Sequence, residues 1–355
     1  MRRMIVLGAM ALAVGAAHAQ WTLENSNSTA SLRGIHSLGG GIAWASGTNG
    51  TVLRTEDGGY LWQTCTIPPG AEKLDFRGIQ AFDANTAIVM SSGKGDLSRL
   101  YKTTDGCSSW KLIFTNPDPD GFWDAILLNR FDKDGFLLGD PVNGKFTLRE
   151  TNDKGNTWTR GSSKGLDAAK DEGAFAASNS SFLLNEIFAI GFVTGGPAGA
   201  HIFLIGDYPD FNSKALPMRG GSAGAGAFSV DLRDSRHWAT VGGDYQKSDE
   251  SSGTAAFTVD GGKTWQAAKQ PPHGYRSAVA YDATTKTWIT VGPNGTDIST
   301  DDGKNWRAVK PNASLNEPAD ADKNWNALSL PFVVGPHGRI GKLNEPALKA
   351  ALTTK

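Results

Sequence analysis

Short runs of alternating apolar and polar residues, separated by glycine-rich or polar turns, recur along the chain. The runs that begin a repeating unit are LRGIHSL (32–38), FRGIQAF (76–82), WDAILLN (123–129), AFAASNS (174–180), AFSVDL (227–232), YRSAVAY (275–281) and WNALSL (325–330). A turn follows, then a second run such as IAWASG (42–47) and a third such as TVLRT (51–55). Short alternating runs without a helical period predict β-strands, so the pattern indicates an all-β chain.

An octet that ends in tryptophan follows the third strand of most units, and a fourth strand begins at this tryptophan. Its copies are TEDGGYLW (55–62), TTDGCSSW (103–110), TNDKGNTW (151–158), TVDGGKTW (258–265) and STDDGKNW (299–306). The intervals between the octet aspartates are 48, 48, 107 and 41 residues, and Asp207 in the worn copy LIGDYPDFNS (204–213) divides the long interval into 54 and 53. Four strands in each unit of this length predict a β-propeller with seven blades.

The two ends of the repeat array complement each other. The last unit stops at GRIGKL (338–343) without an octet, whereas QWTLEN (20–25) resembles a strand that follows an octet tryptophan. We therefore expect the N-terminal strand to complete the last blade, which closes the ring and removes exposed sheet edges. This gives one seven-bladed β-propeller of four-stranded blades over residues 20–344, followed by a C-terminal tail at 345–355.

The octets lie between the third and fourth strands, so we expect each one to form a hairpin turn. Aspartate oxygens accept backbone N–H groups in turns, glycine supplies positive φ, and tryptophan suits the gap between blades. A structural role is expected for Asp57, Trp62, Asp105, Trp110, Asp153, Trp158, Asp260, Trp265, Asp301 and Trp306. The alternative is a calcium loop, which needs more carboxylates than the octets offer; DKDG (132–135) is the nearest other match.

The first 19 residues have the features of a secretory signal peptide. Arg2 and Arg3 precede an apolar run and an Ala-His-Ala motif, so we expect cleavage after Ala19 and an exported, periplasmic or secreted protein without a transmembrane segment. Without the two arginines the formal charge changes from −1 to about −3, which does not indicate nucleic-acid binding. Export permits a disulfide between Cys65 and Cys107, but the sequence leaves a disulfide and two separate thiols as equal alternatives.

Candidate binding residues follow from the geometry of propellers, in which strand one lines the central channel. The loop before strand one and the loop between strands two and three share the face opposite the octets. Residues placed there are Arg33, Arg77, Asp124, Asp140, Glu172, Asp244, Tyr245, Arg276 and Asn326. Three arginines converging on one mouth would bind a carboxylate or phosphate.

Three interpretations of this charged mouth remain open: blade-to-blade ion pairs that plug the channel, a binding site for a peptide or an acidic ligand, and a hydrolase site. The histidines show no metal-ligand spacing, and the glycine-rich stretches lack the strand–helix context of a dinucleotide site. We expect no cofactor and no metal ion.

The octet resembles the Asp-box, or BNR, repeat, whose pattern is Ser/Thr-x-Asp-x-Gly-x-x-Trp. Four copies match fully, whereas Cys107 stands at the glycine position of TTDGCSSW. With its seven units and openings such as LRGI, the chain resembles, over about residues 25–340, the group related to the photosystem II stability/assembly factor. The resemblance implies a propeller whose octets are structural and lie away from the binding face. In photosynthetic members it implies a role in protein-complex assembly.

Asp-boxes also occur in sialidases, which use an arginine triad, a Tyr–Glu pair and an acidic Asp on a six-bladed propeller. This chain differs, because it has Arg-Gly-Ile at 33–35 and 77–79 where sialidases have Arg-Ile-Pro, and it has seven units. The leading hypothesis is an exported, monomeric, non-enzymatic scaffold that binds a protein segment or an acidic ligand at its mouth. The alternative is a sialidase-like glycoside hydrolase acting on a carboxylate-bearing glycan.

Overall fold

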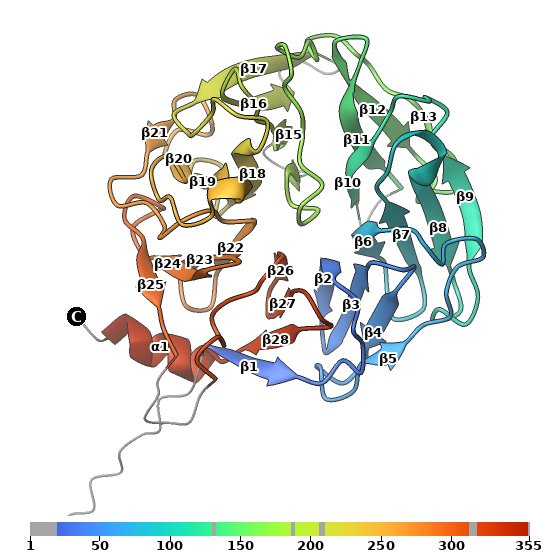
Figure 1. The fold of residues 1–355 in the computed structure, drawn as a ribbon, viewed down its shortest axis with the longest axis horizontal. Helices are drawn as coiled ribbons and strands as arrows, with labels where there is room; N and C mark the ends of the chain where they lie inside the picture. The colour runs from blue at the N-terminus through green and yellow to red at the C-terminus, as the bar shows by residue number, and fades with distance from the viewer. Residues whose placement is uncertain (1–19, 130–132, 186–188, 206–209, 312–317, 354–355) are drawn as a thin grey trace, which may run out of the picture.

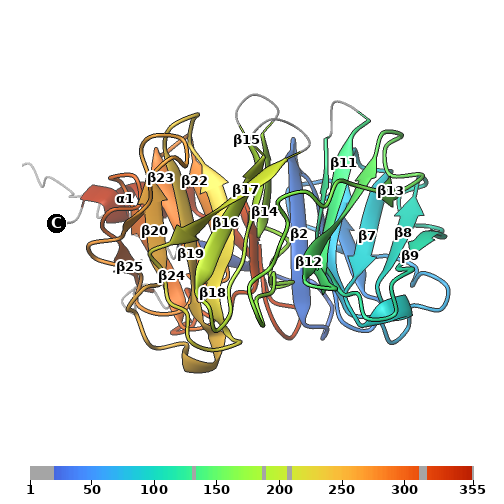
Figure 2. The ribbon, with the colours of Figure 1, turned by 90° about the horizontal axis from the view of Figure 1, so that it is seen from above.

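A computed structural model shows seven four-stranded antiparallel sheets arranged in a ring around a central channel (Figure 1). It describes residues 20–129, 133–185, 189–205, 210–311 and 318–353. Figure 2, turned by 90°, shows the strands running between the two faces of the ring. The prediction of an all-β, seven-bladed propeller is therefore confirmed. The signal peptide, Asp207 and Asp132 of DKDG lie outside the described residues.

Each blade is named by its order in the chain, and its strands run outward from the channel. Blade one contains β2 (Leu32–Gly39), β3 (Ile42–Gly47), β4 (Val52–Thr55) and β5 (Gln63–Thr64). Blade two contains β6 (Phe76–Ala81), β7 (Ala87–Ser91), β8 (Arg99–Thr103) and β9 (Lys111–Thr115). Blade three contains β10 (Trp123–Leu128), β11 (Gly135–Val142), β12 (Lys145–Thr151) and β13 (Thr159–Arg160). Blades four and five contain β14 (Phe182–Asn185), β15 (Ala189–Val193), β16 (Ala200–Ile205) and β17 (Phe211–Leu216); and β18 (Ala225–Leu232), β19 (Trp238–Asp244), β20 (Ala255–Thr258) and β21 (Gln266–Ala267). Blades six and seven contain β22 (Ala278–Asp282), β23 (Thr287–Gly292), β24 (Gly295–Ser299) and β25 (Arg307–Val309); and β26 (Ala327–Ser329), β27 (Phe332–Val334), β28 (Ile340–Leu343) and β1 (Trp21–Glu24).

The ring closes in blade seven, where the N-terminal strand β1 pairs with β28. Trp21 lies opposite Leu343 and Glu24 lies opposite Ile340 in this antiparallel pair. The indole Nε1 of buried Trp21 also donates a 3.0 Å hydrogen bond to the Oγ1 of Thr296 in blade six. The expected completion of the last blade by the N-terminal strand is thus confirmed.

One segment differs from the sequence predictions. The run at 174–180 was expected to be the inner strand of blade four, but that strand, β14, begins at Phe182. The side-chain amide of Asn179 instead pairs with both backbone groups of Ile126 in blade three, at 2.8 and 3.0 Å, and the Oγ of Ser178 donates to Ser277 O, before blade six. The run therefore crosses the channel, because its hydrogen bonds go to other blades and not to a ladder in its own blade.

The segment predicted as a C-terminal tail contains the helix α1 (Glu345–Thr353), which lies on the outer edge of the ring beside β1 and β25 (Figure 1). Buried Leu348 packs in the same apolar cluster as Trp21. The Nη2 of Arg307 donates a 2.6 Å hydrogen bond to the carbonyl of Ala351. The helix therefore covers the closure of the ring.

The five octets that end in tryptophan form the same hydrogen-bonded turn. In the fifth blade, the Oγ1 of Thr258 donates to Asp260 Oδ1 and accepts from the N–H of Gly262, while Asp260 Oδ1 accepts from the N–H of Thr264. The corresponding bonds occur in the octets of Asp57, Asp105, Asp153 and Asp301. The Thr264 hydroxyl also donates to Asp260 Oδ2, and this bond, with those from the Thr264 N–H and the Thr258 hydroxyl, lowers the pKa of Asp260 to about 2. The octets are thus self-contained turns whose carboxylates are occupied.

The octet tryptophans pack against the preceding blade. Trp62 of blade one meets Phe332 of blade seven edge-on, with ring centroids 5.4 Å apart, and Trp306 of blade six packs in a cluster with Val241 of blade five. Trp110, Trp158 and Trp265 occupy the corresponding clusters at three other junctions.

Cys107 stands where the other octets have glycine, and it adopts the same left-handed backbone, with φ of 66° against 75° at Gly155. It forms a disulfide with Cys65, which follows the outer strand of blade one. The disulfide therefore joins the outer edge of blade one to the octet of blade two, which decides between the two alternatives left by the sequence.

Candidate functional site

A cavity of 490 Å³ opens at the channel mouth where the inner strands begin. Six of the nine predicted binding residues line it: Arg33, Arg77, Asp124, Asp140, Tyr245 and Asn326. The crossing segment lies beneath this cavity, because residues 174–177 line it while residues 178–180 line a second cavity of 480 Å³ among the other ends of the inner strands. The structure thus gathers most of the predicted residues at one mouth.

The two arginines at the mouth share one carboxylate, that of Asp75. The Nε of Arg77 donates to Asp75 Oδ2 at 2.8 Å, and the Nε of Arg33 lies 3.2 Å from Oδ1. The Nη1 of Arg77 also donates to Ala176 O at 3.3 Å, whereas the Nε of Arg33 and the Oδ1 of Asp75 have no hydrogen-bond partner among the described residues. Burial lowers the pKa of Arg33, neighbouring Arg77 acts in the same direction, and Asp75 opposes them. Two cations therefore face one anion here.

Asp124 and Asp140 form a second charged element of the cavity wall. Asp124 is only 1% exposed, and its Oδ2 has no hydrogen-bond partner in the described part of the chain. Half-buried Asp140 accepts a 3.0 Å hydrogen bond from the N–H of Ala174. Burial raises the pKa of Asp124 well above its ordinary value, Asp140 adds to this effect, and Arg77 opposes it. Burial also raises the pKa of Asp140 to about 6. The negative charge of Asp124 and Asp140 is therefore poorly compensated by hydrogen-bond donors and cations nearby.

Aromatic side chains form much of the remaining wall. Phe228 stacks on Phe175 of the crossing segment and meets Tyr275 edge-on, with ring centroids 4.8 Å apart. Tyr245 also meets Phe228 edge-on, and it is 51% exposed at the rim. The mouth thus combines an arginine pair, a carboxylate pair and an apolar wall.

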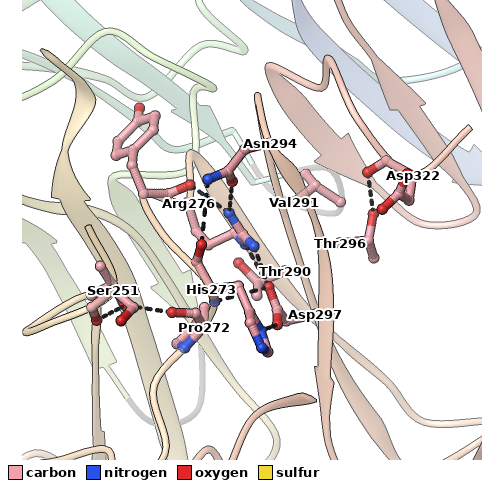
Figure 3. Close-up of polar contacts among 12 residues, drawn as sticks. Ser251, Pro272, His273, Arg276, Thr290, Val291, Asn294, Thr296, Asp297 and Asp322 are labelled. Carbon is pink, nitrogen blue, oxygen red and sulfur yellow. Dashed lines mark hydrogen bonds and ion pairs between the residues drawn. The ribbon is translucent and has the colours of Figure 1, made fainter. Parts of the chain in front are cut away.

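Arg276 does not join the other two arginines. Figure 3 shows its guanidinium directed at the carboxylate of Asp297, which Arg276 Nε approaches to 2.9 Å and which also contacts His273. Arg276 and Asp297 are both buried, at 1% and 0% exposure, and Arg276 Nη1 donates to Asn294 and to the Tyr275 carbonyl. The expected triad is therefore corrected to a pair, because Arg276 is fully occupied inside blade six.

Two more predicted residues have internal partners. Buried Glu172 accepts hydrogen bonds from the Thr194 hydroxyl and the N–H of Ala169, and its Oε1 lies 2.9 Å from Nδ1 of His201. Burial alone would raise the pKa of Glu172, but these bonds lower it.

Asp244 accepts hydrogen bonds from Ser222 Oγ and from the N–H of Gln246, and so caps the 3₁₀ turn η2 (Tyr245–Lys247). Neither Glu172 nor Asp244 is among the residues that line the mouth cavity. Asn326 does line it, and its amide holds the Leu32 carbonyl at 2.8 Å.

The sequence did not single out Asp75 or the aromatic wall. The spacing offered one signal for Asp75, since it lies two residues before Arg77 at the entry to an inner strand. Phe175 and Phe228 meet only because the run at 174–180 leaves the expected ladder.

Within the described residues no cluster of three or more metal-ligating side chains occurs. No described helix has the length and apolar character that crossing a membrane requires.

No protein-family model matches the chain, and no curated protein matches it. Among solved structures, YCF48 bound to D1 peptide is similar, with a TM-score of 0.62 and 15% identity over 92% of this chain and 99% of that one. YCF48 from Cyanidioschyzon merolae has a TM-score of 0.61 and 16% identity over 92% of this chain and 100% of that one. A GH74 xyloglucanase from Xanthomonas campestris has a TM-score of 0.55 and 14% identity over 92% of this chain and 53% of that one. At these identities the likeness is one of fold, so the chain is a seven-bladed propeller that resembles YCF48.

Proposed function

We propose that this chain is an exported, non-enzymatic scaffold that binds a segment of a partner protein at the channel mouth. In this proposal a carboxylate of the segment binds between Arg33 and Arg77. The observation that carries it is the sharing of Asp75 by two arginines, in which the Nε of Arg33 lies 3.2 Å from Asp75 Oδ1 but has no hydrogen-bond partner among the described residues. Hydrogen bonds to charged groups contribute about 1.5–3 kcal/mol each, so one added carboxylate would bind favourably here.

The kind of partner is suggested by the similar fold of YCF48, one structure of which is bound to a D1 peptide. The cavity has the dimensions and the mixed apolar and charged lining that suit a few residues of an extended segment. The signal-like N-terminus supports export of the scaffold, with the mouth presented to partners outside the cytoplasm.

The test is affinity capture from the host periplasm with the wild-type protein and the double variant Arg33→Ala/Arg77→Ala. Arg160→Ala is the matched control, because it removes one exposed arginine on the outer strand β13. The double variant is expected to lose at least tenfold of the captured partner, whereas the control retains it. Equal recovery by the double variant would refute binding at the mouth.

A sialidase-like glycoside hydrolase is the second candidate, and the Asp124–Asp140 pair favours it. A general acid needs a carboxyl group that stays protonated near neutral pH, and burial raises the pKa of both residues in the required direction. The test is turnover of an aryl-glycoside panel that includes an aryl sialoside. Turnover that disappears in Asp124→Asn would establish the enzyme and overturn the scaffold proposal.

A further inference from the structure

The carboxylate pair has a feature that the arginine pair does not explain. Arg77 is the cation that acts on Asp124, yet its Nε is bound to Asp75 and its Nη1 to a backbone carbonyl. Asp124 therefore keeps a buried Oδ2 without a hydrogen-bond partner in the described chain. A buried carboxylate oxygen without a partner costs free energy, and an incoming donor would remove that cost.

The space beside the pair is suited to an incoming group. Asp140 lines both the mouth cavity and an adjoining cavity of 570 Å³, and the two cavities also share Phe122 and Phe175. The adjoining cavity is also bordered by the acidic residues Asp120, Asp171 and Glu172, and by a single cation, Lys170, among the described residues. Asp120 is paired with exposed Lys94, and Glu172 with His201. Asp140 is half-buried, so a group that enters between the cavities meets it before it meets buried Asp124.

The chemistry of the lining selects an organic cation over a metal ion. Two carboxylates fall short of the six or more oxygen ligands that calcium requires, and aromatic rings, among them Phe122, Phe175 and Phe228, line the same cavity. Ammonium and guanidinium groups bind favourably both to carboxylates and to the faces of aromatic rings.

We propose that Asp124 and Asp140 form a subsite for a lysine or arginine side chain of the bound segment, a few residues from the carboxylate held by Arg33 and Arg77. This inference rests on the proposed function and specifies its ligand as a segment carrying both charges. The aromatic wall of Phe175 and Phe228 contacts the apolar residues of the segment near the charged ones.

The test begins with a random nonapeptide library displayed on phage and selected on the wild-type protein, on Asp140→Asn and on Arg33→Ala/Arg77→Ala. Wild type is expected to enrich sequences with a basic residue at fixed spacing from an acidic residue. Selection on Asp140→Asn is expected to lose the basic residue alone, and selection on the double arginine variant to lose the acidic residue alone. Asp96→Asn, on the turn between β7 and β8, removes an exposed carboxylate and serves as the matched control.

A double-mutant cycle then measures the contact. With a selected lysine peptide, Asp140→Asn is expected to weaken binding at least tenfold, and with the norleucine version of that peptide less than twofold. Enrichment of acidic residues without basic ones, or equal losses for both peptides, would overturn the subsite while leaving the proposed function intact. Failure to enrich any peptide on wild type would overturn both.

Discussion

Asp140→Asn is predicted to stabilise the protein at neutral pH. Burial raises the pKa of Asp140 from 3.8 to about 6, so at pH 7 the folded protein holds this side chain ionised at a cost. Raising a carboxyl pKa by about two pH units corresponds to about 3 kcal/mol. We expect a gain of about 1–3 kcal/mol, because the amide oxygen can still accept the N–H of Ala174 while the charge beside Asp124 is removed.

The pH dependence gives the sharper test of this reasoning. The folded protein binds the Asp140 proton more tightly than the unfolded chain does, so the stability contributed by protonation is complete below about pH 4. It is lost as the pH rises through about 6. The advantage of the variant over wild type should therefore be close to zero at pH 4 and reach its full value by pH 7.

The assay is urea unfolding followed by the fluorescence of the 11 tryptophans between pH 4 and 7.5. Asp96→Asn controls for the general loss of a surface carboxylate, because Asp96 is exposed in the turn between β7 and β8. A variant no more stable than wild type at pH 7, or a difference that does not change with pH, would refute the assigned cost. Either result would mean that an unrecognised donor already compensates the pair.

Three further predictions concern the scaffold. Asp260→Ala removes the acceptor of the octet turn and should cost about 1–2 kcal/mol without changing ligand affinity; lost affinity at an unchanged melting temperature would contradict its structural role. Cys65→Ser/Cys107→Gly opens a disulfide across 42 residues and should lower the unfolding free energy by up to about 4 kcal/mol, checked by comparing its urea midpoint with that of disulfide-bonded wild type. Arg276→Ala leaves the Asp297 carboxylate buried without its guanidinium and should cost about 3–5 kcal/mol in urea unfolding, whereas a stable variant with weakened ligand binding would restore Arg276 to the site.

The propeller architecture was predictable from the sequence because each octet turn is formed by residues that are close together in the chain. Each turn is closed by bonds among residues no more than four apart, such as Thr258, Asp260 and Thr264, so the sequence contains all of its partners. Repetition of a local turn at regular intervals then fixes the number of blades. The closing strand was predictable for the same reason, since Trp21 occupies the position of an octet tryptophan.

The crossing segment and α1 were not predictable because their partners are distant in sequence. The run at 174–180 alternates like a strand, but Asn179 satisfies the backbone of Ile126 in another blade and thereby replaces a ladder. The helix α1 packs Leu348 into the apolar cluster that contains Trp21, from the other end of the chain. Periodicity does not report such contacts, since tertiary packing overrides local preference.

The roles of the charged residues at the mouth could not be predicted from the sequence either. Arg33, Arg77 and Arg276 occupy equivalent positions of the repeat, and their sequence contexts alone do not separate them. Their roles differ because the carboxylates that pair with them lie in different places. Asp297 lies in the sheet of blade six and forms a buried ion pair with Arg276. Asp75 lies at the rim of the mouth, where Arg33 and Arg77 share it.

The position of Asp75 also determines whether Arg77 can pair with Asp124 in the other charged part of the mouth. If Arg77 were free to turn to Asp124, the arginine and carboxylate pairs would neutralise each other and the channel would be plugged. Because Asp75 holds Arg77, Arg77 acts on Asp124 electrostatically while its own ion pair is with Asp75. Charges kept apart in this way favour a ligand that brings both signs at a matching spacing, and they disfavour a ligand that brings either sign alone to the wrong wall. Replacement of Asp75 should therefore allow Arg77 to pair with Asp124, so that the arginine pair and the carboxylate pair would no longer act as two separate subsites.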